Sequence, residues 1–219
     1  MRQSAVIGGY DAVLPRTVRR KNLTAPDRCR ADNRQSARCP RGDRAGGMTV
    51  HSVPERTDAP EYFFKYIDLV PGGDIRAILQ QQVAETLALL RGISEEQSQH
   101  QYAPDKWSVR QVVSHVNDTE RVFAFRALWF ARGFQSELPS FDQNIAARYA
   151  AADQPPLTHH VGDFEAVRSS TLALFRHLPA DAWQRRGVVS NHEFTIGALA
   201  YIIAGHVAHH MNILRERYL

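Results

Sequence analysis

The chain has 219 residues, of which 43% are hydrophobic and 23% are charged, as is typical of a globular protein that folds in water. No apolar run is long enough to cross a bilayer, so we expect no membrane role. The net charge of +4 arises in residues 1–47, which hold eleven basic and four acidic side chains. The remaining residues hold 16 basic and 19 acidic side chains, so we expect the folded part not to bind nucleic acid.

The first segment, residues 1–47, shows no hydrophobic periodicity and is rich in arginine and small polar residues. We therefore predict an arginine-rich disordered extension. A transit peptide is disfavoured by its four aspartates, and Arg19-Arg20 lacks the apolar run of a twin-arginine signal. The composition changes at Met48, which we interpret as the native start, with the preceding residues not native. Residues 48–219 are then predicted to form the folded domain.

Two amphipathic helices are predicted in the first half of this domain. The first begins after Asp74, an N-cap residue, and ends at Gly92. The second begins with a capping box, in which Ser108 and Gln111 each bond the backbone N–H of the other, and it ends at Gly133. Apolar residues recur at helical spacing in both segments, so we expect each helix to bury one face.

Two further helices are predicted in the second half. The third spans roughly residues 158–178 and is followed by Pro179, which cannot continue a helix. The fourth begins near Thr195 and runs to the carboxyl terminus. Between them we expect at most a short extended piece at residues 187–190, because nothing there alternates long enough to form a sheet.

These four helices predict an all-α fold, a four-helix bundle. A helix of such a bundle spans about 30 Å. The connection between the second and third helices, residues 134–157, is long enough to cross that distance. We therefore predict a crossover that leaves the second and third helices parallel, with a short extra helix at residues 144–152.

Two histidines of the fourth helix, His206 and His210, are four residues apart and so lie one turn apart on the same face. They occupy positions of an apolar stripe where aliphatic residues would be expected. A buried imidazole needs a polar partner. The stripe consists of Leu199, Ile203, His206, His210 and Ile213.

Two neighbours of this pair have different predicted roles. His209 is rotated away from the stripe by one position, so we expect it at the rim. Gly205 removes a side chain beside the pair, and we expect this to open space for a ligand.

His115, early in the second helix, is the expected third member of the group. It lies about 10 Å from the start of its helix, and His210 lies about 13 Å from the end of the fourth helix. If these helices are antiparallel, the three imidazoles fall at similar depth. Three histidines would hold a metal ion with one position left open, as in catalytic zinc centres. The other interpretation is that they are unrelated core or surface histidines, since the chain has ten.

Two stretches of sequence carry a family resemblance. Residues 107–121 resemble the helix-two signature of the DinB-like (DinB/YfiT) superfamily, and residues 204–212 resemble its helix-four signature. Residues 132–142 are similar to one branch of it, so the resemblance covers about residues 60–219. It implies a four-helix bundle with a crossover between helices two and three and a divalent metal on three histidines. By motif these are His115, His206 and His210, and the resemblance alone also implies a homodimer.

Our main hypothesis for function is a metal-dependent enzyme that activates water or a low-molecular-weight thiol to act on a small-molecule substrate. Members of the family include thiol-dependent S-transferases, isomerases and hydrolases, and three imidazoles suit zinc, nickel, iron or manganese equally. Both cysteines, Cys29 and Cys39, precede the predicted domain, which fits a cytoplasmic location and requires any thiol to come from a cosubstrate. The alternative is a non-enzymatic metal- or ligand-binding bundle in a stress response, and a third is a purely structural helical protein.

Few other side chains are candidates for a part in chemistry. Asp118 lies one turn from the histidine of the second helix and is a candidate acceptor for its imidazole. Asp118, Glu120 and Arg121 fit a solvated surface or a structural ion pair equally well. Tyr201 and Arg126 are candidates for facing the cavity, although no spacing requires it.

Overall fold

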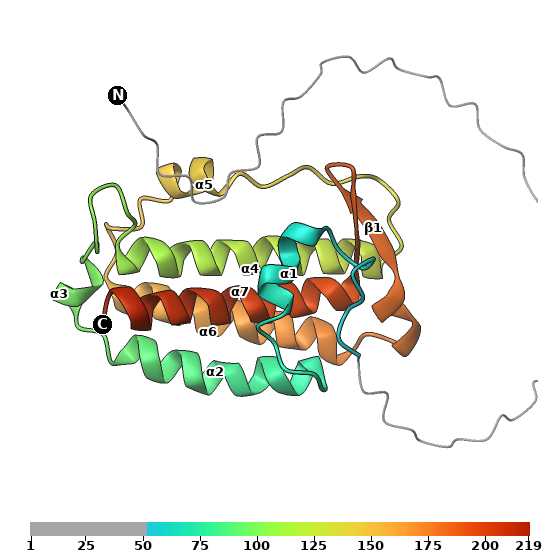
Figure 1. Cartoon of the computed structure of the whole chain (residues 1–219), viewed down its shortest axis with the longest axis horizontal. Coiled ribbons are helices and arrows are strands. Elements are labelled where there is room, and N and C mark those ends of the chain that lie inside the picture. Colours follow the sequence, from blue (N-terminus) through green and yellow to red (C-terminus); the bar gives the residue numbers. More distant parts are fainter. Residues whose placement is uncertain (1–51) are drawn as a thin grey trace, which may run out of the picture. The chain divides into compact units, whose positions relative to one another are not determined.

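The computed structural model describes residues 52–219 (Figure 1). The predicted disorder of residues 1–47 and the domain boundary at Met48 lie outside the described residues. Two short 3-10 turns, Glu61–Phe63 and Ala180–Gln184, accompany the helices and strands. The helices and strands are α1 (Phe64–Ile67), α2 (Ile75–Arg91), α3 (Glu95–Ser98), α4 (Val109–Ala131), α5 (Gln143–Tyr149), α6 (Leu157–Arg176), β1 (Arg186–Val189), β2 (His192–Thr195) and α7 (Ile196–Arg217).

The four long helices α2, α4, α6 and α7 form a four-helix bundle, as predicted from the sequence. Helix α4 packs against α6 and α7, and α2 packs against the same two helices from the opposite corner. Figure 1 shows that α4 and α6 run in the same direction, because the connection between them returns along the bundle and carries α5. Helix α7 runs antiparallel to α4, so the start of α4 and the end of α7 share one end of the bundle.

The long helices begin at the residues that their capping side chains predict. The Asp74 carboxylate accepts a hydrogen bond of 3.0 Å from the backbone N–H of Arg76 at the start of α2. At α4 the capping box forms as expected, with the Gln111 side chain accepting from the backbone N–H of Ser108 at 2.9 Å. Thr195 caps α7. These bonds satisfy donors that a helix amino terminus otherwise leaves unpaired.

Replacing Ser108 with Ala is expected to lower the free energy of unfolding by about 1–2 kcal/mol, near the upper end for a helix cap. The Ser108 hydroxyl has a second partner, the Asp153 carboxylate at 2.5 Å, which joins the start of α4 to the crossover. Ser94→Ala is a matched control, because Ser94 forms the same capping box at an exposed position before the short α3. Urea unfolding of both variants should show the smaller loss for Ser94→Ala, and equal losses would contradict the tertiary role of Ser108.

Several elements differ from the sequence prediction. The expected extended piece is β1, and it pairs antiparallel with β2, although no sheet was predicted. The turn between the strands places Ser190 and Asn191 at positive φ, a conformation that joins two-residue hairpins. Helix α5 ends at Tyr149 rather than at residue 152, and Ala151 also has positive φ. The predicted third helix ends at Arg176, two residues earlier than expected.

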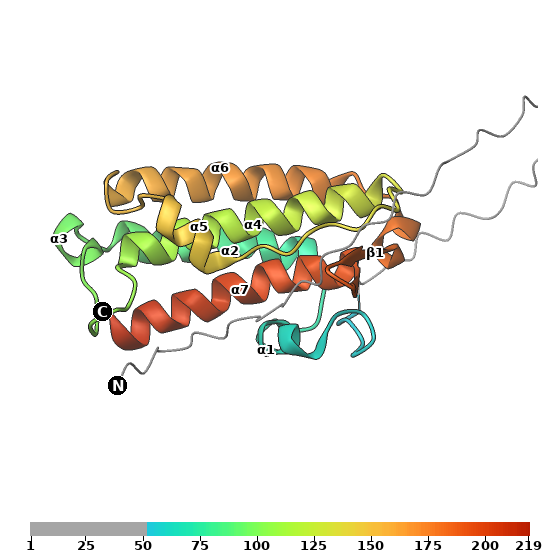
Figure 2. The ribbon, with the colours of Figure 1, turned by 90° about the horizontal axis from the view of Figure 1, so that it is seen from above.

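Helix α1 was not predicted, and it covers part of the outside of the bundle. It packs against α7 (Figure 2). Phe64 and Ile67 of α1 are buried, so this short helix contributes to the core. None of the described helices is long and apolar enough to span a membrane.

A bidentate ion pair lies inside the bundle, between Arg168 of α6 and Glu120 of α4. The Arg168 side chain is fully buried, and its two bonds to the Glu120 carboxylate are 2.8 and 2.9 Å long. The same guanidinium donates to the backbone carbonyl of Leu79 and to the side-chain oxygen of Gln82, both on α2. Glu120 is therefore a structural ion-pair partner, one of the two roles that its position in the sequence allowed.

Candidate metal centre

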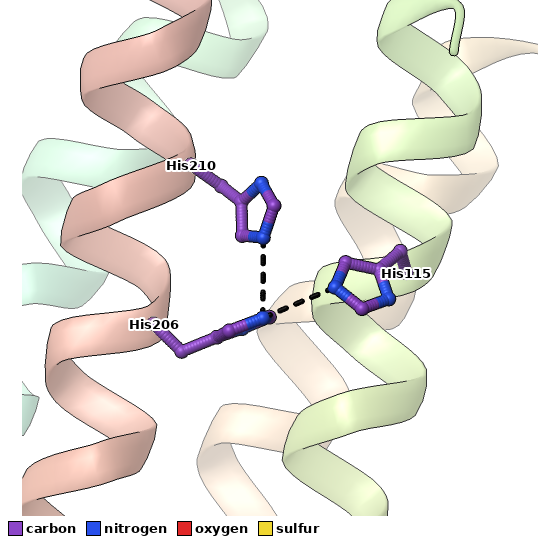
Figure 3. A group of neighbouring side chains, drawn as sticks. All are labelled: His115, His206 and His210. Carbon is purple, nitrogen blue, oxygen red and sulfur yellow. Dashed lines mark hydrogen bonds between the residues drawn. The ribbon is translucent and has the colours of Figure 1, made fainter. Parts of the chain in front are cut away.

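Three histidines from the facing helices α4 and α7 converge on one another (Figure 3). The Nε2 atom of His206 lies 3.1 Å from Nε2 of His115 and 3.1 Å from Nε2 of His210. One ring nitrogen from each of the three histidines falls within 4.8 Å of the others, and all three residues are buried. The depth comparison made from the sequence therefore predicted correctly that these side chains meet.

The chemistry of these contacts fits a metal ion better than it fits hydrogen bonds. A neutral imidazole nitrogen is either a donor or an acceptor, so Nε2 of His206 can form a hydrogen bond with only one of its two neighbours. Imidazole ligands lie about 2.0–2.1 Å from a zinc ion, which places two ligand nitrogens about 2.9–3.4 Å apart at bond angles of 90–109°. The two observed separations of 3.1 Å fall in that range.

The electrostatic setting keeps the three imidazoles neutral. Burial, and to a smaller extent the neighbouring His209, lowers the pKa of His115 to about 4. Burial also lowers the pKa values of His206 and His210 well below their usual range, and the other imidazoles of the group add to the shift. Neutral imidazole is the form that binds a metal, so these side chains are available as ligands at neutral pH.

The metal-free protein is expected to lose stability as the pH falls from about 6.5 towards 4. Histidines of the unfolded chain take up protons below about pH 6.5, whereas folded His115 stays neutral until about pH 4. The unfolded state then binds more protons, so acid favours unfolding, by about 2 kcal/mol from His115 alone at pH 5. Urea unfolding at pH 7.5 and 5 in the presence of a chelator measures this loss. In His115→Gln the difference between the two pH values should shrink by about the same amount.

The Nδ1 atom of His115 lies 3.3 Å from the hydroxyl of Thr119, one helical turn along α4. This hydroxyl orients the ring so that Nε2 points into the group. Asp118, the candidate acceptor identified from the sequence, instead accepts a bond from Arg121, which also pairs with Asp163 of α6. Sequence reasoning missed Thr119, although its spacing of four residues from His115 was visible.

Two neighbours of His206 and His210 on α7 can be compared with their predicted roles. His209 is half-buried at the rim, as expected, and Tyr66 of α1 contacts both His209 and His206 with ring centroids 5.3 and 5.2 Å apart. The expectation that Gly205 opens space for a ligand is wrong. The backbone of Tyr66 occupies that space, and a Cβ atom at residue 205 would overlap the Tyr66 carbonyl group.

Two other candidates form hydrogen bonds to backbone carbonyls. The Tyr201 hydroxyl donates to the backbone carbonyl of Gly73, and Arg126 donates to the carbonyl of Pro139. Trp107, just before α4, packs its ring 5.0 Å from the ring of His115 and helps to shield it. Among the described residues, no carboxylate forms a hydrogen bond or ion pair with any of the three converging histidines.

Comparisons with known proteins agree with this picture of the fold. A sequence model of the DinB superfamily matches residues 78–214. A solved structure with a similar fold is YfiT from Bacillus subtilis, described as a probable metal-dependent hydrolase with an unusual four-helix bundle topology. It is 16% identical, and the superposition covers 74% of this chain and 89% of that chain with a TM-score of 0.60. A comparison with curated proteins found no significant match.

Proposed function

The chain belongs to the DinB superfamily, and from this premise we propose that it is a metal-dependent hydrolase acting on a small-molecule substrate. His115, His206 and His210 are the proposed ligands of a divalent ion. The observation that supports this most strongly is the approach of three ring nitrogens that hydrogen bonding alone does not satisfy. The description of YfiT as a probable metal-dependent hydrolase supports the reaction class by analogy.

When bound, a divalent ion with three protein ligands and an open position supplies Lewis acidity and lowers the pKa of water. The protein holds the ligands in place for this role. Thr119 fixes the ring of His115, and the packing of Trp107 and Tyr66 against the imidazoles limits the entry of water from those sides. Zinc, nickel, iron and manganese all suit such a donor set.

Metal analysis of protein purified without a histidine tag tests the proposal directly. We expect close to one equivalent of divalent metal in the wild type, and loss of it in His115→Ala, His206→Ala and His210→Ala. His209→Ala is the matched control, because His209 is adjacent in sequence but half-buried at the rim. Its metal content should equal that of the wild type. Normal metal content in all three ligand variants would refute the site.

The reaction class needs a second experiment. A panel of ester, amide and lactone substrates is expected to reveal hydrolysis that depends on added metal and disappears in His206→Ala. A parallel screen with glutathione, bacillithiol and mycothiol against a general electrophile tests the thiol-transferase alternative from the sequence. Activity only in the second screen would replace hydrolysis with thiol transfer.

One observation favours a non-enzymatic metal-binding bundle as the second candidate. Within residues 52–219 no carboxylate forms a hydrogen bond or ion pair with the imidazoles, and Asp118, the acid nearest to His115 in sequence, is paired with Arg121, so no acid–base group is bonded to them. Stoichiometric metal together with no detectable activity in both screens would favour that role. A cytoplasmic location and homodimers stay predictions from the sequence.

A further inference from the structure

The crossover between α4 and α6 contains a strap, which we define as residues 140–150. It includes α5, and none of its side chains is buried. Its hydrogen bonds are internal, such as those from the backbone N–H of Ala146 to the Asp142 carbonyl and from Ala150 to the Ala146 carbonyl. Among residues 52–219, no hydrogen bond or ion pair joins the strap to the rest of the protein. The strap is therefore held over α4 by packing alone.

Both ends of the strap are anchored. On the preceding side, the backbone N–H of Leu138 donates to the carbonyl of Val188 in the hairpin at 3.0 Å. On the following side, the carbonyl of the buried Ala152 lies 2.8 Å from Nε2 of His160, and Arg110 donates to the carbonyl of Asp153 at 3.0 Å. A loosely held segment between two fixed ends has the structure of a movable cover.

A pocket lies between α4 and the strap, and the ligand residue His115 forms part of its wall. The α4 side is formed by polar residues, and the opposite side is formed by Phe141 and a series of alanines. The lining residues are Gln111, Ser114, His115, Asp118, Phe141, Ala146, Ala147, Ala150 and Ala152. Of the three converging histidines only His115 lines the pocket, so the pocket borders one ligand residue of the candidate metal centre.

The pocket has room for about one water molecule as it stands. We propose that it is the closed form of the substrate pocket of the metal centre, and that outward movement of the strap opens it. This inference rests on the proposed function, because it gives the route by which a substrate reaches the three histidines. Small alanine side chains along the strap let it lie close to α4 when the pocket is empty.

The lining indicates the class of ligand. Within the described residues, no lysine or arginine lines the pocket, and its single carboxylate, Asp118, is already paired with Arg121. Ser114 and Gln111 offer hydrogen-bonding groups opposite the apolar strap. The pocket thus suits a small uncharged molecule that has an apolar face and a hydrogen-bonding group, and it disfavours phosphorylated or other strongly anionic compounds.

Imidazole binding to the cobalt-substituted protein tests the pocket. Imidazole is a small molecule that is largely uncharged at pH 8, and its binding is measured from the change in the visible absorption of Co²⁺. Ala147→Phe adds a ring at a position that lines the pocket, and we expect it to weaken imidazole binding at least tenfold with unchanged cobalt content. Asn144→Phe adds a ring to the same helix at an exposed position outside the pocket, and it should change binding less than twofold.

Hydrogen exchange of the full chain tests the strap independently. The amides of Ala146 and Ala150 should exchange at least 100-fold faster than the central amides of α4, because their bonds are local to the strap. Protection equal to that of α4, or equal effects of Ala147→Phe and Asn144→Phe, would overturn the inference. Failure of the wild type to bind cobalt would instead overturn the proposed metal function, and the substrate pocket with it.

Discussion

Glu120→Ala is expected to lower the free energy of unfolding by about 3–5 kcal/mol, the cost of leaving one member of a buried ion pair without its partner. The Arg168 guanidinium is fully buried and receives its only carboxylate contacts among the described residues from Glu120. Removing the carboxylate leaves the positive charge with only the neutral acceptors Leu79 and Gln82. Equilibrium unfolding in urea measures the loss, and near-UV circular dichroism reports whether the folded variant keeps its packing.

Two controls separate the buried pair from ion pairs in general. Asp163→Ala breaks an exposed pair with Arg121, and it should cost less than about 1 kcal/mol. The double variant Glu120→Leu with Arg168→Met replaces both charges by apolar groups, and it should recover most of the stability lost in Glu120→Ala. A loss below 1 kcal/mol in Glu120→Ala would contradict the buried charge as the cause.

Gly205→Ala is expected to destabilise the protein by about 2–3 kcal/mol, as overpacking of a rigid contact does. The added methyl group would overlap the carbonyl group of Tyr66. Backbone cannot rotate away as a flexible side chain can, so α1 must move off α7. The Tyr66 ring would then withdraw from His206, and limited proteolysis should cut the chain near the exposed Lys65 faster than in the wild type.

Gly162→Ala provides the matched control for this substitution. Gly162 also lies inside a long helix, α6, and a Cβ atom there meets nothing within 4 Å. Removing a helical glycine in open space should stabilise the protein by about 0.5–1 kcal/mol. Opposite signs for the two glycine variants are the expected result. Equal stabilisation by both would show that α1 does not press against α7 in solution.

The long helices could be predicted because their signals are local. Capping residues such as Asp74 and Ser108 specify where a helix begins, and the apolar spacing specifies its buried face. The match of His115 with the pair on α7 also followed from local information, since depth along a helix depends on residue number alone. Helix α1 was missed because four residues are too few to show a period.

The errors concern contacts between residues distant in sequence. Gly205 suggested free space, but Tyr66, far away in the chain, fills it. Glu120 gave no sign in the sequence of whether it is exposed or buried, and only the approach of Arg168 from α6 decides that. The hairpin was missed although Ser190-Asn191 suits its turn, because two strands of four residues are too short to alternate clearly.

The buried ion pair also fixes the position of α4 along the bundle axis relative to α7. The Gln82 side chain accepts a hydrogen bond from Arg168 and donates one to the carbonyl of Ala204, two residues before His206. Arg168 in turn pairs with Glu120, five residues after His115. Sliding either helix by one residue, about 1.5 Å, would break this chain of bonds. The ion pair thus fixes the relative positions of the two helices along the bundle axis. The imidazoles of α4 and α7 are therefore held at the same depth without a bound metal ion.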